Sequence, residues 1–189
     1  MIGDTSYDVV LIGVNHDDLV SGGKANTTWQ LKNCYNTTYK INPTNATTGG
    51  YDKSAMHTTH LPSIFSQIQE DVRNAIKPVI KKASVGYLST SFSIVDTNCN
   101  LFLLSEIEIF GEIVHSVSGE GTQYAYWAQH NNNNDRKKGS QSNPTSYDYW
   151  WERSLYVSDL PSFCNVNSDG IAYGYSANLS CGVSFAFCI

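Results

Sequence analysis

The stretch from Arg153 to Ile189 has a composition unlike that of the rest of the chain. It contains no Lys, Glu, Gln, Met or Trp, although all five residue types occur before it. Asn, Ser, Tyr and Gly are frequent instead, with single apolar residues between them. Gly, Asn and Ser favour turns, so this stretch is expected to fold as short strands joined by turns. The absence of these five residue types has two explanations. Either strands and turns rich in Ser, Asn and Gly simply contain few long charged side chains, or the set of residue types allowed in this segment is restricted.

Length and charge limit the class of protein. A chain of 189 residues with 41% apolar composition is long enough for one domain with a core. The net charge is −5, and the scattered Lys and Arg form no basic stripe, so nucleic acid is not an expected partner. Charged residues reach only 15% while aromatic residues reach 12%, which predicts a neutral, aromatic surface suited to contact with other molecules.

The chain shows no sign of a membrane span or a signal peptide. No apolar run approaches the roughly twenty residues that a spanning helix needs, and the start lacks a basic region followed by an apolar one. We therefore expect a soluble protein of cytosolic synthesis. The cysteines form no C-x-x-C pair and are odd in number, so reduced thiols are expected rather than a zinc site or a disulfide framework. They are Cys34, Cys99, Cys164, Cys181 and Cys188.

Hydrophobic patterning predicts two strands and a helical segment in the first half. The β-branched run Tyr7 to Val14 predicts a well-buried strand, and Trp29 to Tyr35 alternates as a second strand would. From Leu61 to Ile80 the apolar residues recur every three or four positions, as in a helix, or in two helices broken near Pro78.

The second half gives weaker signals. Leu101 to Phe110 fits either a strand or a short helix, and Gln129 to Ser146 reads as an exposed loop outside the core. Tyr147 to Ser154 predicts an aromatic strand in which Trp150 and Trp151 point to opposite faces, only one of them into the core. The apolar anchors beyond it are Phe163, Val166, Ala172, Ala177, Val183, Phe185 and Phe187.

Several motifs carry a resemblance to a known family. In the C-terminal part they are Trp150-Trp151-Glu-Arg153-Ser154, Phe163-x-x-Val166-x-x-x-Gly170, Ala177 and Gly182-Val183-Ser-Phe-Ala-Phe-Cys-Ile189. Further upstream they are Asn15-His-Asp-Asp-Leu19, Leu101-Phe-Leu-Leu-Ser-Glu106, Ile109-Phe-Gly111 and Glu120-Gly-Thr-Gln-Tyr124. Together they resemble a domain family of gut bacteria and their phages whose typical pattern is WW-x-RSP, F-x-x-V-x-x-x-G, A-x-x-x-x-GVRPAF. This chain departs from it at Leu155, where the family has Pro, and at Ser184-Phe185, where it has Arg-Pro.

Members of that family are similar to C-type lectin-like domains related to the formylglycine-generating enzyme, and many resemble the variable proteins of diversity-generating retroelements. The resemblance implies an α+β, C-type lectin-like fold with a small twisted antiparallel sheet, one or two helices, and the first and last strands paired. In such systems adenines of a template are randomised and copied into the 3′ end of the gene. An AAC codon then cannot become Lys, Glu, Gln, Met or Trp, the five types that are missing here. The chain is thus one domain, 1–189, with a scaffold, 1–152, and a variable region, 153–189.

The residues between the anchors are expected to line one exposed ligand-binding face. They are Tyr156, Val157, Asp159, Leu160, Ser162, Asn165, Asn167, Asp169, Ile171, Tyr173, Tyr175, Asn178, Leu179 and Ser180. Tyr156, Tyr173 and Tyr175 are the expected hot spots, because Tyr offers a large contact area at little entropic cost. The alternative is that Tyr173 and Tyr175, two positions apart on one strand, fill the core or form a cross-strand pair.

The predicted function is recognition of an unknown protein or glycan, such as one on a cell surface, by a protein displayed on a phage virion or a bacterial surface. No catalytic residue, metal or cofactor is predicted, and a homo-oligomer is one alternative, as in a structural display protein. The rival is an enzyme or metal-dependent binding domain, based on His16-Asp17-Asp18, on His57-x-x-His60, or on Cys181 and Cys188. Capping or solvated roles are the favoured interpretation of these histidines, the cysteines are interpreted as small hydrophobic residues, and Glu106, Glu108 and Glu112 as a solvated face. The chain also lacks the Glu-Pro-Asn, Gln-Pro-Asp and Trp-Asn-Asp motifs of calcium-dependent sugar binding.

Overall fold

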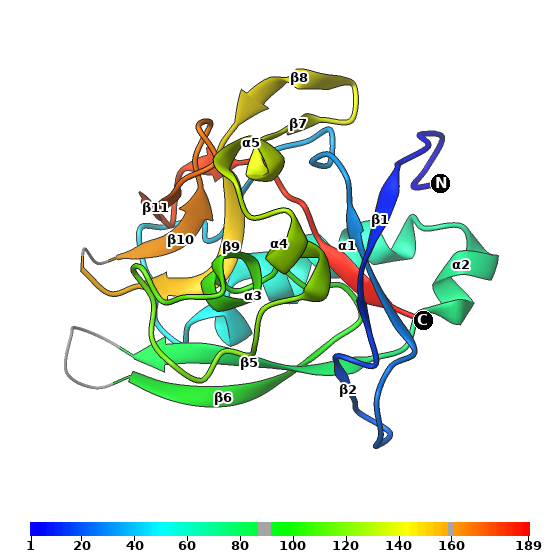
Figure 1. Cartoon of the computed structure of the whole chain (residues 1–189), viewed down its shortest axis with the longest axis horizontal. Helices are drawn as coiled ribbons and strands as arrows, with labels where there is room; N and C mark the ends of the chain where they lie inside the picture. The colour runs from blue at the N-terminus through cyan, green and yellow to red at the C-terminus, as the bar shows by residue number, and fades with distance from the viewer. Residues whose placement is uncertain (87–91, 159–160) are drawn as a thin grey trace.

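The two ends of the chain meet in one antiparallel sheet. The computed structural model, which describes residues 1–86, 92–158 and 161–189, is a mixed α+β protein of small antiparallel sheets and a few short helices (Figure 1). The predicted α+β class is therefore confirmed. None of the helices in these residues has the length and apolar character that crossing a lipid bilayer requires.

The terminal sheet has the order β1-β3-β13, so the prediction that the first and last strands pair is wrong. Its strands are β1 (Val9–Val14), β3 (Thr27–Leu31) and β13 (Ala186–Cys188). β3 carries the buried residues Gln30 and Leu31 and pairs on both edges, with β1 on one side and β13 on the other. β1 is an edge strand in this sheet. It is also less buried than predicted, because Val9, Leu11 and Val14 are 39%, 41% and 61% exposed.

A long hairpin forms the second sheet, of order β2-β5-β6. Its strands are β2 (Asp18–Leu19), β5 (Val79–Gly86) and β6 (Phe92–Cys99). The predicted helical stripe ends earlier than its apolar pattern, because Val79 and Ile80 begin β5 instead. Pro78 has no N–H to continue a helix and disfavours helical conformation at the residue before it.

The predicted helix from Leu61 to Ile80 is divided into two short helices, α1 (Leu61–Ser66) and α2 (Glu70–Ala75). Two further helical turns precede it, the 3₁₀ turn η1 (Tyr51–Lys53) and the π-helix η2 (Met56–His60). The break between α1 and α2 lies around Ile68, whose backbone forms a β-bridge with Ile2 near the N-terminus. This tertiary contact, unlike the proline, has no signal in the local sequence.

The segment that fitted either a strand or a helix forms a short helix after a buried irregular stretch. Leu101 to Leu104 are buried and lie outside any helix, and α3 (Glu106–Phe110) follows. Ser105 and Glu108 form a capping box at its start, and Gly111, with a φ of 75°, ends it in the left-handed conformation. Local sequence therefore sets both ends of this helix.

The C-terminal part forms a sheet of order β11-β10-β9, with small two-stranded sheets β12-β4 and β7-β8 beside it. The strands are β9 (Trp150–Tyr156), β10 (Ser162–Val166), β11 (Ala172–Ser176), β12 (Ser180–Cys181), β4 (Tyr39–Lys40), β7 (Lys138–Ser140) and β8 (Asn143–Asp148). The predicted aromatic strand is thus split between β8 and β9, at Tyr149.

Both tryptophans of β9 are fully buried, so the prediction that only one enters the core is wrong. Trp150 packs against Trp127 and donates its indole N–H to the carbonyl oxygen of Arg136 at 2.9 Å. Trp151 donates to the carbonyl oxygen of Tyr39 at 2.8 Å. β9 is covered on both faces, which alternation within one strand cannot reveal.

The segment Gln129 to Ser146 is not the loop outside the core that its composition predicted. It contains part of α4 (Ala125–Gln129), α5 (Asn133–Arg136), β7 and the start of β8. Lys138 is 4% exposed, donates to the carbonyl oxygens of Leu31 and Lys32, and lies over the rings of Trp127 and Trp150. Backbone carbonyls and aromatic faces compensate for the burial of its charge.

This burial predicts a pH dependence of stability. Desolvation lowers the pKa of Lys138 from 10.5 to about 8, so the unfolded chain binds more protons than the folded one between these values. The free energy of unfolding should therefore rise with pH through that window, by up to about 3 kcal/mol relative to Lys138→Met. Urea unfolding at several pH values measures the difference. Lys137→Met is the matched control and should follow the wild-type profile; identical profiles for both variants would contradict the prediction.

Candidate functional site

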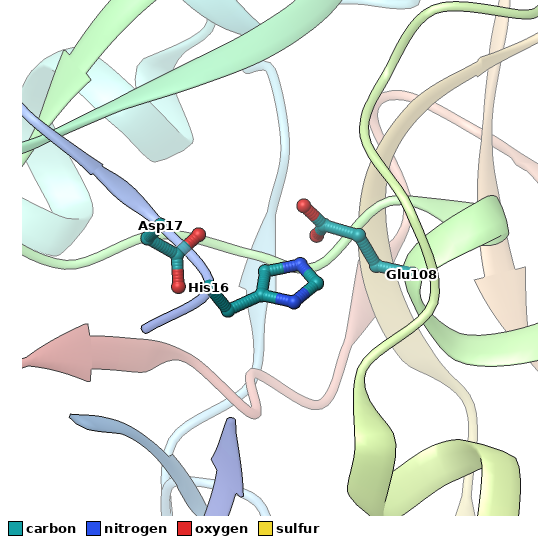
Figure 2. A group of neighbouring side chains, drawn as sticks. All are labelled: His16, Asp17 and Glu108. Atoms are coloured by element: carbon teal, nitrogen blue, oxygen red, sulfur yellow. The ribbon is translucent and has the colours of Figure 1, made fainter. Parts of the chain in front are cut away.

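A polar cleft of about 350 Å³ opens between the N-terminal segment, the β5–β6 hairpin and α3. Its lining is unusually rich in charged groups for a cavity of this size. They include His16, Asp17, Lys81, Glu108, Glu120 and Arg153. Three of these side chains, His16, Asp17 and Glu108, converge on one another in Figure 2.

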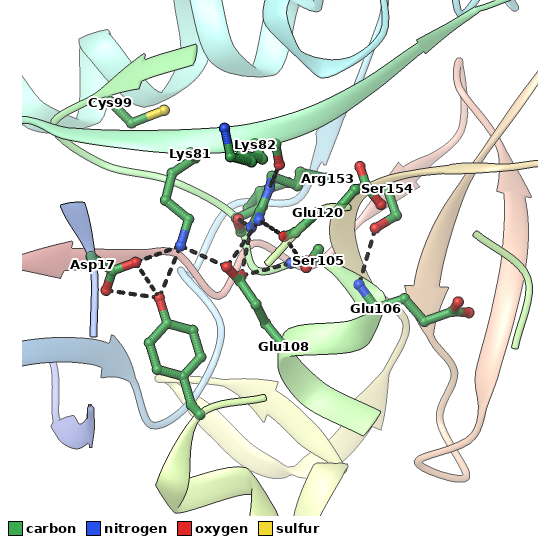
Figure 3. A network of polar contacts seen from close by, with 12 residues as sticks. Asp17, Lys81, Lys82, Cys99, Ser105, Glu106, Glu108, Glu120, Arg153 and Ser154 are labelled. Atoms are coloured by element: carbon green, nitrogen blue, oxygen red, sulfur yellow. Dashed lines mark hydrogen bonds and ion pairs between the residues drawn. The ribbon is translucent and has the colours of Figure 1, made fainter. Parts of the chain in front are cut away.

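Lys81 joins two carboxylates at the bottom of this cleft (Figure 3). Lys81 lies two positions from both Val79 and Ala83 along β5, so its side chain points to the same buried side of that strand. Its Nζ lies 2.6 Å from Asp17 Oδ1 and 2.6 Å from Glu108 Oε1, and it donates to the Tyr124 hydroxyl at 3.0 Å. The three N–H donors of the ammonium group are thereby used.

Arg153 completes the network from β9. Its guanidinium pairs with both oxygens of Glu108, at 2.6 and 2.9 Å. It also donates to the carbonyl oxygens of Lys82, Leu103 and Glu120. The whole side chain is fully buried, so each N–H that finds an oxygen avoids a large desolvation cost.

The network keeps its carboxylates ionised. Burial acts to raise the pKa of Asp17, but the charge of Lys81 and hydrogen bonds from Lys81, Thr28 and Tyr124 outweigh it and hold this pKa well below its usual range. Arg153 and Lys81 lower the pKa of Glu108 in the same way, against the effect of burial. The stability that these carboxylates contribute is present above their unfolded pKa and is lost as the pH falls below it.

His16 lines the cleft as a half-buried side chain. Its ring stacks on Tyr124 with centroids 4.0 Å apart, and burial lowers its pKa, which favours the neutral imidazole. Ligand atoms of His16, Asp17 and Glu108 lie within 4.8 Å of one another, as a metal site requires. Lys81 Nζ, however, already occupies the cationic position between the two carboxylates. The arrangement therefore suits an internal ion network better than a metal centre.

A second candidate site lies on the β10–β11 hairpin and the residue before β9. The rings of Tyr149 and Tyr173 meet edge to face at 5.9 Å, and those of Tyr149 and Tyr175 lie 5.3 Å apart. Tyr175 also packs on the buried Trp151, 6.3 Å away, while Tyr173 is 47% exposed. We call Tyr149, Tyr173 and Tyr175 the tyrosine face.

The structure separates the predicted ligand-binding residues by burial. Exposed ones are Asp169, Ile171, Tyr173, Leu179 and Ser180, and half-buried ones are Tyr156, Val157, Asn167, Tyr175 and Asn178. The prediction is wrong for Ser162 and Asn165, which are 5% and 0% exposed, because every residue of the central strand β10 is buried and both of its faces are therefore covered. Asp159 and Leu160 lie outside the described residues.

The predicted anchors are all buried, as expected for the fixed part of the segment. They are Phe163, Val166, Ala172, Ala177, Val183, Phe185 and Phe187. The core alternative for the tyrosines holds in part, since Tyr175 is half-buried against Trp151 whereas Tyr173, on the same face of β11, remains open.

The remaining chemical candidates are not assembled into a site with the cleft. His57 packs against Tyr51 with its Nδ1 3.9 Å from the Cys99 Sγ, and His60 lies against Tyr39. All five cysteines are unpaired and buried. Burial raises the pKa of Cys188 to about 12, so its thiol is a poor nucleophile.

Sequence reasoning missed most of the network. Glu106 and Glu108 were expected on a solvated face and are instead buried, whereas Glu112 is exposed. Lys81, Glu120 and Tyr124 were not identified as site residues. The signal for Lys81 was its place in phase with the apolar residues of β5.

Loss of the central carboxylate should destabilise the fold. Glu108→Gln leaves Arg153 and Lys81 buried with less opposite charge, so the free energy of unfolding is expected to fall by about 3–5 kcal/mol. Asp96→Asn is the control: it breaks an ion pair with Lys82 whose side chains are 53% and 60% exposed, and should cost about 0–1 kcal/mol. Chemical unfolding compares the two variants, and equal small losses would refute a stabilising role for the network.

Comparison with known proteins identifies a family but no better understood relative. No curated protein and no solved structure gives a significant match to the chain. The family model described as "Domain of unknown function (DUF6273)" matches residues 25–189, which include Lys81, Glu108 and Arg153 together with the tyrosine face. The chain therefore belongs to the DUF6273 family.

Proposed function

We propose that this domain is a recognition protein that binds a protein or glycan ligand through the tyrosine face. The observation that carries the proposal is the contact of Tyr149, Tyr173 and Tyr175 with one another above the buried Trp151. Rings held in this way lose little conformational freedom on binding, and their hydroxyl groups can bond a polar partner.

Separation of scaffold and recognition supports the further proposal that a retroelement diversifies the C-terminal segment. Buried anchors alternate in sequence with exposed residues: Ile171 is 47% exposed beside Ala172 at 6%, and Leu179 is 40% exposed beyond the buried Ala177. Substitution at exposed positions costs little stability, whereas substitution at buried ones creates cavities or strain. The absence of five residue types after Glu152 agrees with diversification of AAC codons; these types are Lys, Glu, Gln, Met and Trp.

A C-type lectin-like fold is our proposal for the finer architecture. Support comes from the small antiparallel sheets, from the short helices α1 and α2, and from the presence of both terminal strands in one sheet. On this proposal the domain is displayed on a phage virion or a bacterial surface, where its partner lies on another cell. Several copies of the domain on one particle would bind with higher avidity than a single copy.

Population sequencing tests diversification directly. We expect deep sequencing of the 3′ end of the gene to find variation concentrated in codons for exposed residues such as Ile171, Tyr173 and Leu179. Codons for the buried Trp150 and Val183 should stay constant, and a template repeat and a reverse transcriptase gene should lie nearby. Uniform codons without a template would contradict diversification and leave ligand binding to be tested alone.

A point variant tests the tyrosine face. Tyr173→Ala should weaken binding by about 2 kcal/mol or more, roughly 30-fold, without a change in melting temperature, because the ring is 47% exposed. Flow cytometry of labelled protein on intact cells of the source community measures the binding. Val14→Ser, an exposed change on the edge strand β1, is the control that should bind as wild type does.

Tyr175→Ala separates the two roles of that residue. Because Tyr175 also packs on Trp151, this variant should lose both binding and some thermal stability. A large fall in melting temperature with intact binding by both tyrosine variants would assign the face to packing and refute its role in recognition.

A further inference from the structure

A second polar cluster is enclosed between α3, β9 and β10, apart from the Lys81 and Arg153 network. It consists of Glu106, Glu152 and Cys164, each 0% exposed. One ligand atom from each residue lies within 4.8 Å of the other two. In Figure 3 the Glu106 carboxylate points away from Glu108 and the rest of the first network.

Glu106 is surrounded by hydrogen-bond donors. Its oxygens accept hydrogen bonds from the backbone N–H groups of Val114, His115 and Ser116 and from the Ser116 hydroxyl, at 2.7 to 3.0 Å. These donors fix the position of its carboxyl group inside the protein.

Glu152 has no such support. Among the described residues neither of its carboxyl oxygens has a hydrogen-bond partner, although both are buried. The nearby cations are engaged elsewhere: Arg136 donates to the carbonyl oxygens of Gly170 and Asn131, and Arg153 pairs with Glu108. A buried carboxyl group beside a second one is costly unless a positive charge or a donor joins them.

Cys164 adds a soft ligand to these two hard ones. Its thiol reaches the carbonyl oxygen of Leu155 at 3.5 Å, which is a weak contact for a buried polar group. A thiolate with two carboxylates is a ligand set suited to zinc, whereas calcium and magnesium take oxygen ligands in larger number.

We propose that Glu106, Glu152 and Cys164 bind a divalent zinc ion that stabilises the fold. The two free oxygens of Glu152 allow it to chelate, so that the three side chains together offer four donor atoms. Binding forms a bond from zinc to Cys164 Sγ and releases the thiol proton, with any proton held by Glu152, to solvent. Because the cluster is fully buried, the ion enters as the chain folds.

The site differs from the prediction of no metal because its ligands share no short motif. Glu106 and Glu152 are far apart in the sequence, and Cys164 has no second cysteine at ligand spacing. The proposal is also independent of ligand recognition, since the cluster is buried beneath the surface whereas Tyr173 is exposed.

The wild-type chain tests the proposal without any substitution. Protein unfolded, stripped with chelator and refolded with excess zinc should retain about one equivalent of metal after desalting. Refolding with cobalt should give a thiolate-to-cobalt charge-transfer absorption band, which no site made of His16, Asp17 and Glu108 would produce. Wild-type protein that retains no zinc and shows no such band would overturn the proposal and make Glu152 a neutral buried acid.

Substitutions then assign the ligands. Cys164→Ser and Glu152→Gln should each lower zinc retention at least about tenfold, since each removes one of the bonds that hold the ion. Cys34→Ser, at another buried free cysteine, and His16→Ala, at the polar cleft, should retain zinc and the cobalt band. Full retention by Cys164→Ser, or loss in Cys34→Ser alone, would place the metal elsewhere and refute the assignment.

Discussion

The carboxylate of Glu108 is the contact on which the interior depends. It pairs with Arg153 from β9 through both oxygens and with Lys81 from β5, and its Oε2 also accepts the backbone N–H of Ser105 at the start of its own helix. One side chain thereby joins a helix, the central hairpin and the C-terminal sheet. Charged groups at 0 to 4% exposure are stable only as a complete set, because removal of one leaves the others desolvated and unpaired.

This rigid interior explains how an irregular C-terminal segment can hold a defined surface. β9 is buried along nearly its whole length and carries both Trp151, under the tyrosine face, and Arg153, in the ion network. Side chains on β11 project from a sheet whose position is fixed by the buried residues of β9. A recognition surface built in this way can change in sequence while the anchors, which bury the apolar area, keep the fold.

The two buried clusters differ in how far their charges are compensated. Around Lys81 and Arg153 the cations donate to oxygens and both oxygens of Glu108 are paired, although Glu120 Oε2 has no hydrogen-bond partner among the described residues. Around Glu152, a carboxyl group faces Glu106 and Cys164 without a hydrogen bond among the described residues. The contrast between these two neighbouring clusters is the physical basis for the metal assignment, because a protein interior rarely leaves such a group without a partner.

The sequence by itself determined the buried apolar anchors and part of one strand, since the predicted strand from Trp29 to Tyr35 overlaps β3 at Trp29 to Leu31, because local periodicity encodes these features. The α+β class was implied by the family resemblance. The sequence also predicted one helix, or two broken near Pro78, whereas the break lies between α1 and α2 and the residues after Pro78 form β5. Only the tertiary structure decided that β3 separates the first and last strands, that both Trp150 and Trp151 are enclosed, and that Lys138 lies in the core. The ion network and the cluster at Glu152 belong to this second group. Their members come from distant segments, and a charged residue has the same local pattern whether it faces water or a partner brought to it by folding.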